Sequence, residues 1–222
     1  FKKFYKTDIS NISVNIESNL PIGIGLSSSA ATCVSMIRAL SSLFEINLDQ
    51  ATMVKIAHCI ENDFVGVGGG VMDQFVSVYG ETDKALFLNT KNNDYKLIPL
   101  FDDYNFQIID SGIKRILSDS AFNDRKKMCN QSAGKIGVKY LCDKDKIDQK
   151  DKDLLSTSEL KVIRHVIEEN IRSKKGSEAL LNNDPKLFGE LMTQSHNSLA
   201  KDYAVSCTEL DQLVQLCNEY GA

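Results

Sequence analysis

The residues best suited to chemistry begin with a loop of glycines and serines. The stretch Pro21–Ala31 places Gly23 and Gly25 two residues apart and follows them with three consecutive serines, Ser27–Ser29. Two glycines let a backbone turn tightly and come close to a ligand. Serines that open a helix add hydroxyls to the unpaired N–H groups and the positive dipole end found there, which suits a phosphate. The sequence therefore predicts a phosphate-binding loop.

Two better-known glycine patterns do not describe this loop. No Gly-Lys-Ser or Gly-Lys-Thr follows the glycines, so the loop is not a Walker A loop, and the third glycine of the dinucleotide-binding pattern is missing. A glycine-rich turn capped by a serine is the structural alternative, because short glycine motifs often match by chance.

Two carboxylates further along the chain complete a set of candidates. Glu61 follows Val54 and Ala57 at helical spacing, where unpaired burial would cost on the order of several kcal/mol. We interpret it as a magnesium ligand or as a residue at a frayed helix end. Asp73 follows a second glycine-rich stretch, Gly66–Gly70. It is either a base that accepts a substrate hydroxyl proton in phosphoryl transfer or a helix-start acid. A phosphate loop, a metal carboxylate and a base in one chain favour the catalytic interpretation.

Composition narrows the class of protein. The 222 residues carry a net charge of −4, which argues against a nucleic-acid partner. No apolar run approaches the roughly 18 residues of a membrane helix. Six scattered cysteines without a CxxC pair predict neither a zinc site nor a disulfide framework and suit a reducing compartment. We expect a cytoplasmic, monomeric protein that binds small molecules.

Alternation and helical spacing indicate the elements that position these residues. Alternating apolar residues predict a strand over Ile12–Ile16, and the spacing of Cys33–Phe44 predicts a helix directly after the loop. A second helix is expected to start near Asn47. Three further strands are expected at Ala85–Leu88, Tyr95–Leu100 and Phe106–Asp110.

After Ser118 the pattern becomes helical. Three helix starts are predicted, two from capping boxes and one from a cap residue followed by proline: Ser156 with Glu159, Ser206 with Glu209, and Asp184 with Pro185. The charged run Asp143–Asp153 is interpreted as a solvated connection between helices. Strands and helices in the first half and helices in the second predict an α+β fold with two lobes.

Several strings resemble the galactokinase family of the GHMP kinase superfamily over essentially the whole chain. Pro21–Ala31 resembles the second motif of the superfamily. The other matching strings lie at Glu61–Gly66, Gly70–Phe75, Arg164–Asn170, Ser195–Leu199, Asp202–Tyr203 and Ser206–Asp211.

This resemblance implies a GHMP kinase fold. Residues 1–100 would form part of a ribosomal-protein-S5-like, ATP-binding N-terminal lobe, and residues 101–222 part of a mostly helical α+β C-terminal lobe. It implies phosphorylation of galactose at its anomeric hydroxyl, with ATP and Mg²⁺ as cofactors and galactose 1-phosphate and ADP as products. The residues implied at the ATP phosphates are Gly23, Ile24, Gly25, Leu26, Ser27, Ser28 and Ser29.

The resemblance also implies roles for single side chains. Ser29 and Glu61 would hold magnesium, Asp73 would be the base, and Gly70 would line the sugar. Phe122 stands where the family usually has a sugar-contacting tyrosine, which removes one hydrogen bond of about 0.5–1.5 kcal/mol.

The sequence begins at Phe1 and ends at Ala222. The family's first motif, with an arginine and a Glu-His-Asp set for the sugar, and its third, glycine-rich motif are absent between these residues. We therefore expect a piece of a longer product that is inactive by itself. Two other hypotheses stay open: a galactokinase-like sensor of sugar and ATP without turnover, and a kinase for another sugar such as N-acetylgalactosamine or arabinose.

Overall fold

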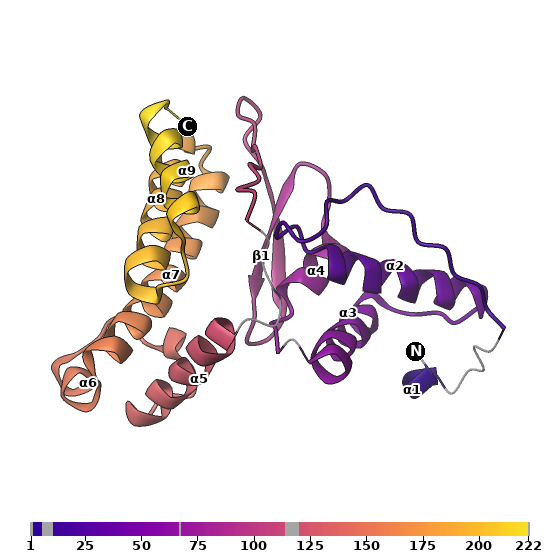
Figure 1. The fold of residues 1–222 in the computed structure, drawn as a ribbon, viewed down its shortest axis with the longest axis horizontal. Helices are drawn as coiled ribbons and strands as arrows, with labels where there is room; N and C mark the ends of the chain where they lie inside the picture. Colours follow the sequence, from indigo (N-terminus) through magenta and orange to yellow (C-terminus); the bar gives the residue numbers. More distant parts are fainter. Residues whose placement is uncertain (1, 6–10, 67, 114–119, 222) are drawn as a thin grey trace. The chain divides into compact units, whose positions relative to one another are not determined.

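The chain forms two compact units (Figure 1). Each unit has its own hydrophobic core. The computed structural model describes residues 2–5, 11–66, 68–113 and 120–221, without the side chains of residues 2, 3 and 120–123. Unit 1 comprises Phe1–Ile98 with Gly112–Ser118, and unit 2 comprises Pro99–Ser111 with Asp119–Ala222. Within the described ranges, no helix is long and apolar enough to cross a membrane.

Unit 1 is built from helices that pack on one another and on a small sheet. Its elements are α1 (Lys2–Tyr5), α2 (Ser28–Leu43), α3 (Gln50–Cys59), the π-helical segment η1 (Ile60–Val65), α4 (Met72–Tyr79), β1 (Lys84–Asn89) and β2 (Asp94–Pro99). Helices α2, α3 and α4 contact one another, and α4 also contacts β1. The core between them consists of Val34, Ile37, Val54, Ile56, Ala57, Phe75 and Val78.

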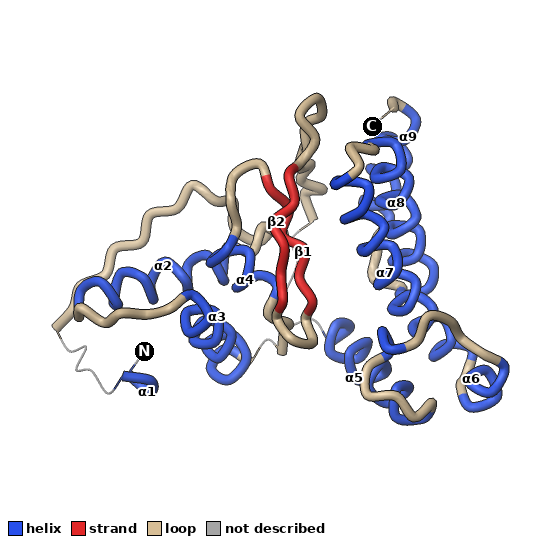
Figure 2. The backbone as a smooth tube through the Cα atoms, turned by 180° about the vertical axis from the view of Figure 1, so that it is seen from behind, coloured by secondary structure: helices blue, strands red, loops and turns tan. Residues whose placement is uncertain are grey.

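The sheet consists of β1 and β2, drawn in red in Figure 2. Only residues 90–93 connect the two strands, so they are antiparallel, because a parallel pair would need a crossover of a dozen or more residues. Asn93 has a φ of 63° and donates its N–H to the carbonyl of Asn89 at 2.8 Å, which closes the turn. Both strands were predicted, and the structure confirms them.

Unit 2 is helical in its described part. Its elements are α5 (Ser120–Lys135), the 3₁₀ segment η2 (Leu141–Asp143), α6 (Gln149–Leu154), α7 (Thr157–Leu181), α8 (Pro185–Ser198), the π-helical segment η3 (Leu199–Tyr203) and α9 (Thr208–Glu219). The long helix α7 contacts α5, η2, α8 and η3. Its predicted capping box is confirmed: Ser156 and Glu159 exchange hydrogen bonds at its first turn. Asp184 caps α8 as predicted, with Pro185 at the first helical position.

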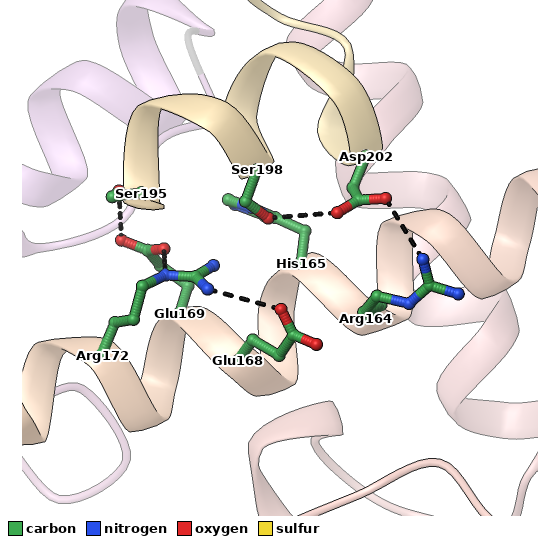
Figure 3. Close-up of polar contacts among 8 residues, drawn as sticks. All are labelled: Arg164, His165, Glu168, Glu169, Arg172, Ser195, Ser198 and Asp202. Atoms are coloured by element: carbon green, nitrogen blue, oxygen red, sulfur yellow. Dashed lines mark hydrogen bonds and ion pairs between the residues drawn. The ribbon is translucent and has the colours of Figure 1, made fainter. Parts of the chain in front are cut away.

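A polar network joins α7 to α8 and η3 (Figure 3). His165 is buried and shares a 3.0 Å hydrogen bond with Ser198, and its ring lies 4.5 Å from that of Tyr203. Ser195 donates to Glu169 at 2.6 Å, and Arg172 donates to the other oxygen of that carboxylate at 2.7 Å. Burial keeps the pKa of His165 below its usual value, so the imidazole is neutral near pH 7.

Two predicted strands are wrong. Ile12–Ile16 is a loop, and the side chains of Val14 and Ile16 are 52% and 59% exposed. The alternation of apolar and polar residues indicates only which side chains would share a face of a strand. A strand also needs a partner, and no second strand pairs with this segment among the described residues. Phe106–Asp110 is also a loop that pairs with no strand among the described residues. Phe106 packs on Phe188 with ring centres 5.7 Å apart.

Two predicted caps are shifted. Helix α3 starts after Asp49, whose carboxylate accepts the N–H of Thr52 at 2.6 Å, and not after Asn47. Helix α9 starts after Cys207 without a side-chain cap, because the Ser206 hydroxyl binds Asp211 at 2.6 Å. The predicted starts are therefore close to the observed ones, but the capping side chains expected at Asn47 and Ser206 do not cap these helices.

The charged run Asp143–Asp153 is more structured than predicted. Part of it forms α6, and the Asp151 side chain is buried there with Lys144 as its ion-pair partner. Asp148 and Asp151 form a capping box that starts this helix. The alternating charges therefore stabilise a helix start instead of forming only a solvated connection.

Candidate phosphate and metal site

The loop before α2 has the backbone that a phosphate site needs. Gly23 and Gly25 have φ angles of 83° and 84°, a conformation that favours glycine, and a Cβ atom added at either would meet no atom within 4 Å. Ser27, at the N-cap position of α2, has a left-handed φ of 52° and makes no side-chain cap. The first turn of α2 thus presents backbone N–H groups with no side-chain cap, at the positive end of its dipole.

Ser29 and Glu61 meet at the start of α2. The Ser29 hydroxyl donates a 2.6 Å hydrogen bond to Glu61 Oε1, although the residues belong to α2 and η1. Glu61 is partly buried. It lies in a π-helical segment that continues α3, and such segments are frequent at functional sites.

Gln74 is the third member of this group, and no role was predicted for it. Its side chain is 1% exposed, and its Nε2 donates a hydrogen bond to Glu61 Oε2. Gln74 precedes the buried Val78 by four residues, so it lies on the core-facing side of α4. A polar side chain at a core position of an amphipathic helix is the signal that could have found it in the sequence.

Asp73 lies in the first turn of α4, directly before Gln74. Its side chain is partly buried and makes no hydrogen bond or ion pair with Ser29 or Glu61 among the described residues. Its backbone carbonyl accepts the hydroxyl of Ser77 at 2.8 Å. Gly70, just before α4, is exposed and has no atom within 4 Å of an added Cβ. The backbone of α4 therefore connects the candidate base to the glutamine bound to Glu61.

The negative charge of Glu61 also acts on a nearby thiol. Cys33 lies one turn after Ser29 on α2, and burial, reinforced by Glu61, raises the pKa of its thiol. The thiol is therefore protonated near neutral pH and is a weak nucleophile.

The oxygen donors of this group fit magnesium better than a transition metal. Mg²⁺ prefers oxygen ligands and is usually held by one or two carboxylates together with waters and substrate phosphates. The described residues hold no cluster of three or more His, Cys, Asp or Glu side chains that could bind a metal alone. Adjacent ligands of an octahedral magnesium ion lie about 2.9 Å apart, which follows from its 2.0–2.1 Å bonds. The 2.6 Å separation of Ser29 Oγ and Glu61 Oε1 is within a few tenths of that value.

The residue predicted to contact the sugar lies in unit 2. Phe122 belongs to α5, but its side chain lies outside the described residues. Of the predicted site residues, the structure brings together Ser29 and Glu61, with the loop Gly23–Ser29 leading into the same helix start.

Comparison with protein families identifies the family of this chain. Residues 1–81 match the family model of the GHMP kinases N terminal domain, and residues 177–222 match that of the GHMP kinases C terminal region. The chain belongs to the GHMP kinase family. Its GHMP kinase fold is confirmed by a crystal structure of Lactococcus lactis galactokinase complexed with galactose, which superposes with a TM-score of 0.80 at 28% identity. That match covers 91% of this chain and 54% of the other.

Curated relatives of this GHMP kinase are galactokinases. The chain is 39% identical over 207 residues to galactokinase of Thermotoga petrophila and 40% identical over 220 residues to galactokinase of Thermosipho africanus. These matches cover 93% and 98% of this chain but 58% and 61% of the relatives. The chain therefore spans about three fifths of the length of these relatives.

Proposed function

We propose that the protein is a galactokinase, which transfers the γ-phosphoryl group of ATP to the anomeric hydroxyl of galactose. The contact between Ser29 and Glu61 beside the open glycine loop carries this proposal, because it joins two oxygen donors at a helix start suited to phosphate. The similarity to galactokinases at 39–40% identity supports galactose as the substrate.

Each side chain has a role in the proposed reaction. The loop Gly23–Ser29 would bind the ATP phosphates through its backbone N–H groups, and Ser29 and Glu61 would hold magnesium. A magnesium ion bound there would neutralise negative charge on the phosphates. Asp73 would accept the hydroxyl proton as the sugar oxygen bonds to the γ-phosphorus and the bond to the ADP oxygen breaks. Gly70 and Phe122 would line the sugar.

The proposed setting is the cytoplasm, with the protein as a monomer that binds ATP and a sugar. All six cysteines are free thiols in the structure, which suits a reducing compartment.

The test is release of ADP by the complete gene product with Mg²⁺, ATP and one sugar at a time. We expect turnover with galactose that exceeds turnover with N-acetylgalactosamine or arabinose. Preference for another sugar would contradict galactose as the substrate and favour a kinase for that sugar. Sugar-dependent nucleotide binding without ADP release would show a sensor and contradict the proposal.

A further inference from the structure

Gln74 is oriented by the carboxylate that it contacts. Its amide must direct Nε2 toward Glu61 Oε2, because the reverse orientation would bring the amide oxygen against a carboxylate oxygen. Ser29 donates to the other carboxylate oxygen. Glu61 is thus held by two donors, one from α2 and one from α4.

Burying the Gln74 side chain does not make the folded state more stable. Its Oε1 atom is buried and has no hydrogen-bond partner among the described residues. A buried polar atom without a partner destabilises the folded state, and an apolar side chain of the same size would avoid that penalty. A residue that costs stability at a core position is expected to serve function.

We propose that Gln74 is a positioning residue that holds the Glu61 carboxylate in the orientation needed to bind the metal of a metal–nucleotide complex. This inference rests on the proposed function for its ligand. Gln74 directly follows Asp73, so its bond to Glu61 also ties the first turn of α4, which carries the candidate base, to η1. Partners of metal ligands of this kind typically change metal affinity 10–100-fold when removed.

The experiment compares Gln74→Met with Gln50→Met in the complete gene product. Methionine keeps the length of glutamine but cannot donate to Glu61. Gln50 lies on α3 and contacts Val78, not Glu61, so it controls for the substitution itself. For each protein, calorimetry measures the Kd of a non-hydrolysable ATP analogue with Mg²⁺ and with EDTA. The ratio of the Kd with EDTA to the Kd with Mg²⁺ reports how strongly metal and nucleotide binding are coupled.

We expect Gln74→Met to lower this ratio about 10-fold or more while the melting temperature stays the same or rises. Gln50→Met should leave the ratio unchanged. In a Glu61→Gln background, Gln74→Met should have little further effect, because Gln74 acts through Glu61. A ratio equal to that of the wild type, or equal changes in both variants, would overturn the inference.

Two further outcomes test whether Gln74 acts on Glu61 or on the fold, and separate this inference from the proposed function. If both Gln74→Met and Gln74→Asn fail to fold, Gln74 is required for the fold, and the argument from its unpaired oxygen is wrong. If the wild type shows metal-dependent nucleotide binding that Gln74→Met weakens, but phosphorylates no sugar, the proposed function fails and the role of Gln74 stands.

Discussion

Ser29 Oγ donates a 2.6 Å hydrogen bond to Glu61 Oε1 across 32 residues of sequence. The distance is typical of a hydroxyl bound to an ionised carboxylate, the stronger class of hydrogen bond. The contact joins the first turn of α2 to η1, so the candidate phosphate loop and the candidate metal carboxylate form one group in unit 1.

Removing the hydroxyl of this pair should weaken catalysis without unfolding the protein. We expect Ser29→Ala to lower kcat/KM roughly 10–100-fold, or about 1.4–2.7 kcal/mol of transition-state stabilisation, and to raise the Mg²⁺ concentration needed for half-maximal activity. Ser29 is exposed, so the melting temperature should change little. Ser35→Ala, at another exposed serine of α2, is the matched control. Equal losses in both variants would contradict a role for the Ser29 hydroxyl.

The proposed base should be separable from nucleotide binding. We expect Asp73→Asn to lower kcat by about 10²–10⁴, because an amide cannot accept the sugar proton, while the affinity for ATP is retained. Steady-state kinetics and calorimetry measure the two quantities. Asp102→Asn replaces an exposed aspartate of unit 2 and should leave both unchanged. Largely intact turnover by Asp73→Asn would show that another group takes the proton.

The glycines of the loop should be needed for their backbone conformation and not for lack of space. An alanine at Gly25 meets no atom within 4 Å but is forced to a φ of 84°, which costs about 1–2 kcal/mol. We expect Gly25→Ala to lower the free energy of unfolding by that amount and to raise the KM for ATP. Gly134→Ala lies in α5 without a positive φ and should be neutral or stabilise by up to about 1 kcal/mol. Urea unfolding of both variants measures the difference.

Acid should destabilise the protein through His165. Its pKa in the folded state is lowered, chiefly by burial, with Glu168, Glu169, Arg172 and Asp202 as the charged groups that act on it. Below its ordinary pKa of about 6.5, the unfolded chain binds a proton that the folded chain resists, so the free energy of unfolding falls as pH falls through that value.

The measurement compares wild type with His165→Gln by urea unfolding at pH 7.5, 6.5 and 5.5. The stability advantage of the wild type should shrink toward pH 5.5, because the glutamine cannot be protonated. An advantage that stays constant across this range would show that His165 does not titrate as its burial implies.

The fold could be predicted where local signals agreed with packing. The predictions were right for the helix after the glycine loop, both hairpin strands and the caps at Ser156 and Asp184. Capping, turns and the spacing of apolar residues all depend on residues only a few positions apart. The strands expected at Ile12–Ile16 and Phe106–Asp110 were not found, because a strand also needs a partner that alternation does not reveal.

The sequence by itself determined which chemical groups are available: a glycine loop that can adopt positive φ angles, a serine at a helix start, and two carboxylates with a family pattern. Only the tertiary structure decided that Ser29 and Glu61 touch, and that the buried amide of Gln74 holds the second oxygen of Glu61. The physical reason is that glycine conformation and capping are local properties. Contact across 32 residues instead depends on how α2, α3 and α4 pack around one core.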